Sequence, residues 1–228
     1  MNNGLPSTFK PATAADFVGD GNWFATLLLR KLAKAGDAPL KWLFCGPPGC
    51  GKTTLADFLA ITMAKNKVAI ETVNGQSCDI EKVRQWNRGT AYKSMFGERI
   101  VQIVNEIDKA SDAAANELRS YLDNLPAGHA FIGTSNLYPD RSPTATEAGD
   151  PKDKTRKLQF QLQRRMFCYE FANPAPEVLG RWMHSKWPSV GLVKAMDIAE
   201  RHEGCVASAL IDLESAMDFE DQVQSVTT

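Results

Sequence analysis

The chain has 228 residues, of which 43% are hydrophobic and 23% charged, and its formal net charge is -1. This composition is typical of a soluble globular protein, and it excludes collagen, a disulfide scaffold and a chain that is disordered throughout. The near-neutral charge gives no overall signature of nucleic-acid binding, which depends on clustered lysine and arginine, so any contact with DNA requires a local patch.

Cysteines, histidines and the N-terminus exclude further classes. The five cysteines form no C-x-x-C pair and the three histidines are isolated, so neither a disulfide framework nor a zinc site is predicted. No window approaches the ~18 consecutive apolar residues of a membrane span, and the first four residues (MNNG) lack the basic and apolar regions of a signal peptide. We therefore expect a cytoplasmic protein with no membrane partner.

Strand and helix patterns alternate along most of the chain. Runs rich in β-branched and aromatic residues predict five strands at 41–45, 69–73, 99–105, 129–134 and 166–171. Helical patterns follow at 53–65, 80–86, 113–125 and 158–165. This alternation predicts an α/β fold in which helices sandwich a five-stranded parallel sheet, and such sheets bind ligands at the carboxyl ends of their strands.

A different organisation begins near Pro174. The run from Ala172 to Pro176 breaks regular structure, and amphipathic patterns then predict only helices, at 176–187, 190–203 and 208–219. We predict an α/β domain over 1–173 and a small helical domain over 174–228. The polar stretch 138–157 predicts a long loop that is either functional or disordered.

The segment from Gly46 to Thr53 matches the pattern G-x-x-x-x-G-K-[ST], between a buried strand and a helix. Its glycines let backbone N–H groups turn toward phosphates, and the helix N-terminus adds partial positive charge. Lys52 reaches the terminal phosphates, and the Thr53 hydroxyl can ligate Mg²⁺. The pattern predicts binding of ATP with Mg²⁺ by Gly46, Pro47, Pro48, Gly49, Cys50, Gly51, Lys52, Thr53 and Thr54.

Polar residues end the third and fourth predicted strands. Asn105 and Glu106 follow the apolar run 100–104, where a P-loop ATPase holds its metal and polarises the attacking water. Glu106 is the candidate general base, and the Asn136 amide could orient the same water. A solvated strand end and an ordinary turn residue remain the alternative interpretations of these positions.

In this order, the motifs resemble those of the clamp-loader branch of the AAA+ ATPases, above all the small subunits of replication factor C and their phage counterparts. The resemblance covers roughly residues 9–220. The segments 9–11 and 16–19 resemble the family's N-terminal box, and 73–84 its segment after the second strand. Residues 105–108 occupy the Walker B position, Asn136 the sensor-1 position, 162–166 the position of the Ser-Arg-Cys motif, and 204–210 the helix that carries sensor 2.

The resemblance implies a role for each matching position. Val18 and Gly19 would touch adenine, Thr53, Asn105 and Glu106 would lie at the metal, and Arg165 would be an arginine finger that completes a neighbour's site. The implied partners are other AAA+ subunits, with a sliding clamp and DNA beyond them.

Four departures from the family pattern weaken the clamp-loader interpretation. The Walker B aspartate is Asn105, and loss of such a partner of the metal site typically costs ~10–100-fold in metal affinity or activity. The sensor-2 arginine position falls on Ala207. The 138–157 loop is longer than the family's link, and we expect no collar domain after the helical domain.

Three functions are compatible with this pattern. The first is an ATP-hydrolysing subunit of a clamp-loader-like complex in DNA replication or DNA processing. The second is an AAA+ regulator of another DNA transaction, such as transposition, helicase loading or phage defence, and the third is a nucleotide-dependent scaffold with little turnover. Two groups of basic residues could contact DNA or equally be solvated surface: Lys152, Lys154, Arg156, Lys157, Arg164 and Arg165, and then Lys82, Arg84 and Arg88.

Overall fold

The computed structural model describes residues 9–89, 99–138 and 162–226, with side chains up to residue 217. Most of the predicted polar loop, including the basic residues at 152–157, lies outside these ranges, as does the predicted helix from 158 to 161. Within the described helices, none combines the length and apolar character needed to span a membrane.

Five parallel strands form one sheet in the order β2-β3-β4-β1-β5, which confirms the predicted fold class. The strands are β1 (Leu40–Cys45), β2 (Ile70–Asn74), β3 (Ile100–Asn105), β4 (His129–Ser135) and β5 (Phe167–Glu170). The central strand β4 is buried at every residue, which explains its continuous run of apolar and small residues.

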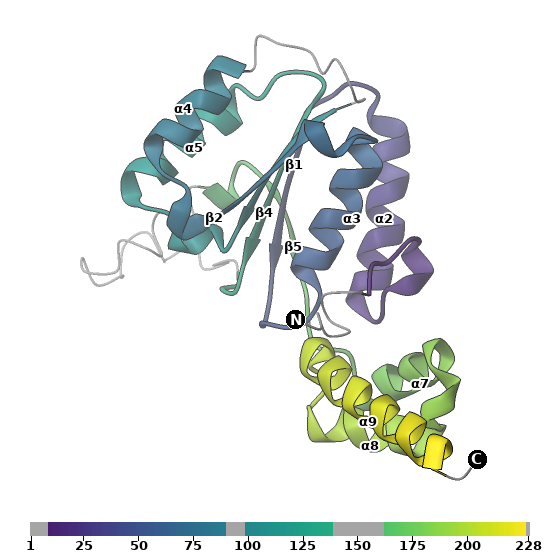
Figure 1. Ribbon diagram of the computed structural model, residues 1–228. Coiled ribbons are helices and arrows are strands. Elements are labelled where there is room, and N and C mark those ends of the chain that lie inside the picture. Colours follow the sequence, from purple (N-terminus) through teal and green to yellow (C-terminus); the bar gives the residue numbers. More distant parts are fainter. Residues whose placement is uncertain (1–8, 90–98, 139–161, 227–228) are drawn as a thin grey trace. The chain divides into compact units, whose positions relative to one another are not determined.

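Helices cover both faces of the sheet (Figure 1), with α4 and α5 on one side and α2 and α3 on the other. Their bounds are α2 (Asp20–Ala35), α3 (Lys52–Ala64), α4 (Ile80–Gly89) and α5 (Asp112–Asp123). Leu43 of β1 and Val104 of β3 pack in one core with Val83 and Trp86 of α4 and Leu118 of α5. Helix α2 was not among the predicted elements.

Short 3-10 turns connect several of these elements. They are η1 (Ala14–Asp16), η2 (Lys67–Ala69), η3 (Gly75–Ser77), η4 (Ile107–Lys109) and η5 (Pro188–Val190). The turns η3 and η4 follow directly on β2 and β3, at the carboxyl edge of the sheet, and so place polar residues where a parallel sheet binds its ligands.

The chain divides into two compact units, each of which is built from segments that are separate in the sequence. One, here called the sheet unit, comprises Leu28–Gly46 and Ala56–Glu170; the other, here called the lid unit, comprises Met1–Leu27, Pro47–Leu55 and Phe171–Thr228. The phosphate loop and the N-terminal segment therefore group with the C-terminal helices. The domain boundary at residue 174 stays a prediction.

Three helices build the C-terminal part of the lid unit: α7 (Pro176–Lys186), α8 (Leu192–Arg201) and α9 (Val206–Val226). They enclose a core of their own, to which Leu179, Met183, Ile198 and Leu213 contribute buried side chains. Val18 of the N-terminal segment packs against the same core.

Candidate functional site

The phosphate loop adopts the conformation that its glycines predict. Gly46, Gly49 and Gly51 have φ angles of 146°, 79° and 96°, values that disfavour residues with a side chain. A Cβ added at Gly51 would meet nothing within 4 Å, so open space lies beside the backbone there. Helix α3 starts at Lys52, and the N–H groups of its first turn have no carbonyl partner within the helix. The loop and helix together form a suitable cradle for phosphates.

Lys52 lies over this loop and is only 6% exposed. Its Nζ donates a hydrogen bond to the Pro47 carbonyl oxygen at 2.6 Å and lies 3.8 Å from Cys50 Sγ. Thr53 is exposed and Thr54 half-buried. The lysine ammonium is thus held against the loop by a carbonyl oxygen, which a phosphate oxygen could replace.

A pocket adjoins the loop entirely within the lid unit. Its walls come from the loop, the N-terminal segment and the C-terminal helices. They are Cys50, Gly51 and Thr54; Phe9, Pro11, Asp16, Phe17, Val18 and Gly21; and Trp182, Val206 and Leu210. The mostly apolar lining suits a small molecule with a flat apolar part.

Among the described residues of the pocket wall, Asp16 is the one carboxylate, and its oxygens are already engaged. Oδ2 accepts hydrogen bonds from the backbone N–H groups of Ala12 and Thr13 at 3.0 and 2.8 Å and from the Thr13 hydroxyl at 3.0 Å. Oδ1 pairs with Lys186 of α7. The Lys186 ammonium, followed by the Thr13 N–H, holds the pKa of Asp16 well below its usual range. Asp16 therefore joins the N-terminal segment to α7.

The resemblance predicts adenine contacts for Val18 and Gly19. Val18 lines the pocket. Gly19 has a φ angle of 56°, and a Cβ placed there would lie 3.0 Å from the Pro174 Cβ. Only Val18 of the two is a wall residue.

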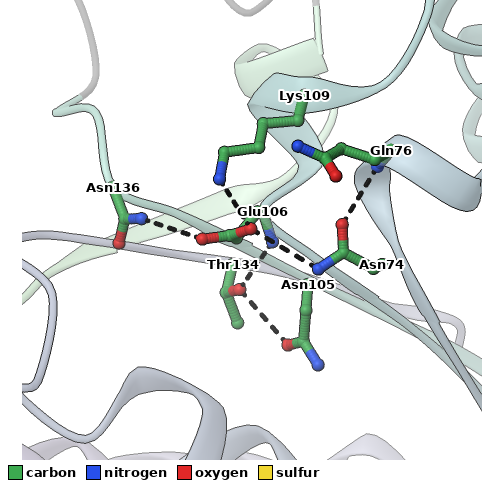
Figure 2. Close-up of polar contacts among 7 residues, drawn as sticks. All are labelled: Asn74, Gln76, Asn105, Glu106, Lys109, Thr134 and Asn136. Atoms are coloured by element: carbon green, nitrogen blue, oxygen red, sulfur yellow. Dashed lines mark hydrogen bonds and ion pairs between the residues drawn. The ribbon is translucent and has the colours of Figure 1, made fainter.

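Glu106 is the centre of a polar cluster at the carboxyl edge of the sheet unit (Figure 2). Its carboxylate accepts hydrogen bonds from Asn136 Nδ2 at 3.3 Å and Asn74 Nδ2 at 3.4 Å, and pairs with Lys109 Nζ at 2.9 Å. These partners come from the ends of β4 and β2 and from η4. The sequence-predicted Glu106 and Asn136 are thus brought together.

The backbone of Glu106 is left-handed, with a φ angle of 53°, which is uncommon for a residue with a side chain. Gly75 permits this arrangement, since a Cβ there would lie 2.1 Å from the Glu106 carbonyl oxygen. Such backbone strain concentrates at functional sites.

Asn105 turns toward β4. Its Oδ1 accepts a hydrogen bond from Thr134 Oγ1 at 3.3 Å, and the same hydroxyl accepts one from the Glu106 N–H at 3.1 Å. Thr134 therefore holds both Asn105 and Glu106, here called the Walker B pair. Position 105 thus carries an amide oxygen, where the family pattern has the carboxylate of an aspartate.

Charge around Glu106 favours its ionised form. The hydrogen bond from Lys109, followed by that from Asn74, lowers the pKa of Glu106, and Glu106 in turn raises the pKa of Lys109. Both side chains reach solvent, where water and salt screen the pair. Glu106 is available as a base but is held by a cation.

Arg165 lies in the turn before β5. Its Nε pairs with Asp123 Oδ1 of α5 at 2.8 Å, and its side chain is 30% exposed. An interaction within its own chain therefore holds the predicted finger.

Sequence reasoning did not single out several residues that the structure places in these sites. Asn74, Lys109 and Thr134 contact the Walker B pair, and Asp16 and Trp182 line the pocket. Lys109 could have been found from its spacing, three residues after Glu106 across a turn. Nothing in the sequence distinguishes Trp182 from a tryptophan that packs in a hydrophobic core.

Comparison with known proteins agrees with this geometry. Residues 42–155, half of the chain, match the ATPase family associated with various cellular activities (AAA). ATPase WRNIP1 of Dictyostelium discoideum is 30% identical over 106 residues, and the replication factor C large subunit of Methanococcus aeolicus is 31% identical over 111. These matches cover 46% and 45% of this chain but only 12% and 22% of the relatives.

The fold comparison reaches further along the chain. A point mutant of RuvB from Thermotoga maritima superposes with a TM-score of 0.68 and 18% identity, covering 96% of this chain and 69% of RuvB. The phosphate loop, the parallel sheet and the lid helices define a P-loop nucleotide-binding protein. The chain belongs to the AAA family, and its replication factor C relative confirms the resemblance to clamp-loader proteins.

Proposed function

We propose that this chain binds ATP with Mg²⁺ and hydrolyses it as a subunit of a clamp-loader-like DNA-processing assembly. The observation that carries the proposal is the pocket in the lid unit, where loop residues Cys50, Gly51 and Thr54 line the same space as the N-terminal segment and the C-terminal helices. One small molecule with a flat base and phosphates fits such a lining.

The family to which the chain belongs supplies the reason to expect ATP, because its members are ATPases. In the pocket wall, Asp16 is held by the N–H groups of Thr13 and Ala12 and by Lys186. ATP is therefore the nucleotide that we expect.

The residues present fit a magnesium ion in their chemistry. Thr53 offers a hydroxyl, Asn105 an amide oxygen and Glu106 a carboxylate, and Mg²⁺ prefers oxygen ligands. Bound Mg²⁺ would neutralise charge on the phosphates. An amide at 105 in place of a carboxylate supplies less negative charge, so we expect weaker metal binding than in a family member with aspartate there.

Glu106 is the proposed general base, and Asn136 the residue that orients the attacking water. Both lie at the carboxyl edge of the sheet unit, where the Gly46 N–H, next to the end of β1, donates to the Ser135 carbonyl oxygen at the end of β4 at 3.2 Å. Lys52 would hold the terminal phosphates while Glu106 accepts the proton of the water. Asn74 and Lys109 restrain the base until then.

Substitution of Lys109 by methionine should release this restraint. The lost ion pair lets the pKa of Glu106 rise toward its ordinary value. Because the base acts when deprotonated, the acid limb of the kcat–pH profile then moves to higher pH. A base of higher pKa is stronger at neutral pH, so we expect turnover there to rise about 2- to 5-fold. Steady-state ATPase assays across pH measure both effects. Lys67→Met is the matched control and should leave the profile as in the parent. An acid limb that does not move in Lys109→Met would show that Lys109 does not restrain Glu106.

Arg165 is the proposed finger for a neighbouring subunit's ATP. Arg165→Ala should bind ATP normally but hydrolyse it about 10³-fold more slowly, since fingers supplied in trans contribute that much elsewhere. Mixing this variant with Lys52→Ala should restore turnover at interfaces that pair an intact loop with an intact finger. Arg164→Ala is the control, and the mixing assay needs the native neighbour if that neighbour is a different chain. If turnover is not restored in the complete assembly, Arg165 does not act as a finger.

Adding the expected partners to the ATPase assay tests which DNA transaction the protein serves. A clamp-loader role predicts that a sliding clamp with primed DNA stimulates ATP turnover. Absence of stimulation, together with recovery of transposition, helicase-loading or phage-defence proteins from native complexes, would favour a regulator of another DNA transaction. Negligible turnover under all these conditions would favour a nucleotide-dependent scaffold.

A further inference from the structure

The first turn of α9 lies against the phosphate loop within the lid unit. The Ala207 N–H donates a hydrogen bond to the Gly49 carbonyl oxygen at 3.1 Å. Just before the helix, Cys205 Sγ lies 3.9 Å from the Pro48 carbonyl oxygen and 3.3 Å from Ser208 Oγ. Two consecutive loop carbonyls are thus in contact with the start of one helix.

Gly49 makes this approach possible. Its φ angle is 79°, and a Cβ at this position would lie 2.6 Å from Cys205 Sγ and 3.3 Å from Ala207 Cβ. A side chain at 49 would therefore be strained and would displace α9. The contact differs from the packing of the lid core, to which α9 contributes Ala209 and Leu213.

The bond to Gly49 also orients the next N–H group. A trans peptide is planar, so the Gly49 carbonyl and the Cys50 N–H point in opposite directions. With the carbonyl directed at α9, the Cys50 N–H is directed to the other side of the loop. Cys50 itself lines the pocket. Tying the carbonyl to the helix thus sets one donor of the phosphate cradle.

We propose that Cys205 and Ala207 are positioning residues, through which α9 fixes the orientation of the Gly49–Cys50 peptide for phosphate binding. The inference rests on the proposed ATP-binding function and deepens it. The resemblance places an arginine at position 207, whose side chain would act on the phosphates. Here a backbone N–H acts on the loop instead.

The coupling is reciprocal. A ligand whose phosphates need the Cys50 N–H in this orientation binds more tightly when α9 holds the peptide, and its binding in turn keeps α9 on the loop. Adenosine, which has no phosphates, fills the base pocket without engaging the phosphate-binding N–H groups of the loop. Phosphate-bearing and phosphate-free ligands should therefore differ in their effect on α9.

The Cys205 thiol reports this contact in the intact chain. A maleimide adds to it by forming a carbon–sulfur bond, while a solvent proton completes the neighbouring ring carbon. Cys205 is half-buried and lies against the loop, so movement of α9 away from the loop would expose the thiol further and speed the reaction. Peptide mass spectrometry would follow adduct formation at Cys205 alone. We expect Mg-ATP at ten times its Kd to slow the reaction about 10-fold and adenosine at the same saturation to leave it unchanged. The purified adduct should bind ATP at least about 10-fold more weakly.

A backbone variant tests the hydrogen bond directly. Ala207→Pro removes the N–H at a first-turn position that tolerates proline, and should weaken ATP binding about 10-fold. Ala207→Ser keeps the N–H and should bind as the parent does. Calorimetry measures the affinities, and if the proline variant fails to fold, the maleimide experiment on the unmodified chain still gives the answer.

The outcomes separate this inference from the proposed function. If calorimetry shows that ATP binds while Cys205 reacts equally fast with and without it, the coupling is wrong. The same holds if adenosine protects Cys205 as well as ATP does. If the unmodified chain binds no ATP, the proposed function itself fails and the coupling fails with it.

Discussion

Lys52→Ala should lower the affinity for ATP by about 100-fold, since a charge-assisted hydrogen bond contributes about 1.5–3 kcal/mol and tenfold in affinity corresponds to about 1.4 kcal/mol. The ammonium is buried over the loop, with Nζ 2.6 Å from the Pro47 carbonyl oxygen. Phosphate oxygens would replace that carbonyl, so the variant loses the only lysine of the loop. Calorimetric titration with Mg-ATP measures the effect.

The fold should survive this change. Alanine removes a buried charge held by the loop's own carbonyl, so we expect the nucleotide-free unfolding temperature to remain close to the parent's. Lys67→Ala, at an exposed lysine of η2, is the matched control and should bind ATP normally. Unchanged affinity in Lys52→Ala would overturn the phosphate-loop assignment.

Glu106→Gln should reduce ATP turnover by about 10²–10⁴-fold, the usual contribution of a general base. Glutamine keeps the shape of the side chain and can still meet Asn74 and Asn136, but it cannot accept the proton of the attacking water. ATP affinity should remain within a few fold of the parent's, because phosphate contacts come from the loop. Single-turnover hydrolysis separates the chemical step from product release.

A nearby acid provides the control for this prediction. Asp112, exposed in the first turn of α5, can be changed to asparagine without touching the polar cluster. Asp112→Asn should hydrolyse ATP as the parent does. If Glu106→Gln also retains the parent's turnover, Glu106 is not the base and the scaffold interpretation gains support.

The sequence predicted the sheet well because its strands carry unambiguous signals. β-branched runs bounded by turn residues identified all five strands, and alternation with helices identified them as parallel. Helix α2 was missed, because it begins with Asp20, Gly21 and Asn22, residue types that are typical of turns. The grouping of Pro47–Leu55 with the C-terminal helices depends on long-range packing, which a local pattern does not contain.

Prediction of the site depended on how far apart its members lie in the sequence. The phosphate loop is contiguous, so its pattern was visible at once. Asn74 meets Glu106 only because β2 and β3 are adjacent, and Gly75 must lack a side chain for that approach. Asp16 and Lys186 are 170 residues apart and pair through the tertiary fold alone. Local reasoning could not have joined them.

Hydrogen–deuterium exchange with and without Mg-ATP tests the central claim most directly, because it reports the phosphate loop, the pocket walls and the segment of the proposed base in one experiment. The account predicts slower exchange in three separate parts of the lid unit, namely residues 9–21, 47–55 and 204–210, and in residues 105–109 after β3. Lys52→Ala should abolish all of these changes together. Protection confined to other segments, or no protection at ATP concentrations that calorimetry shows to be saturating, would contradict the account.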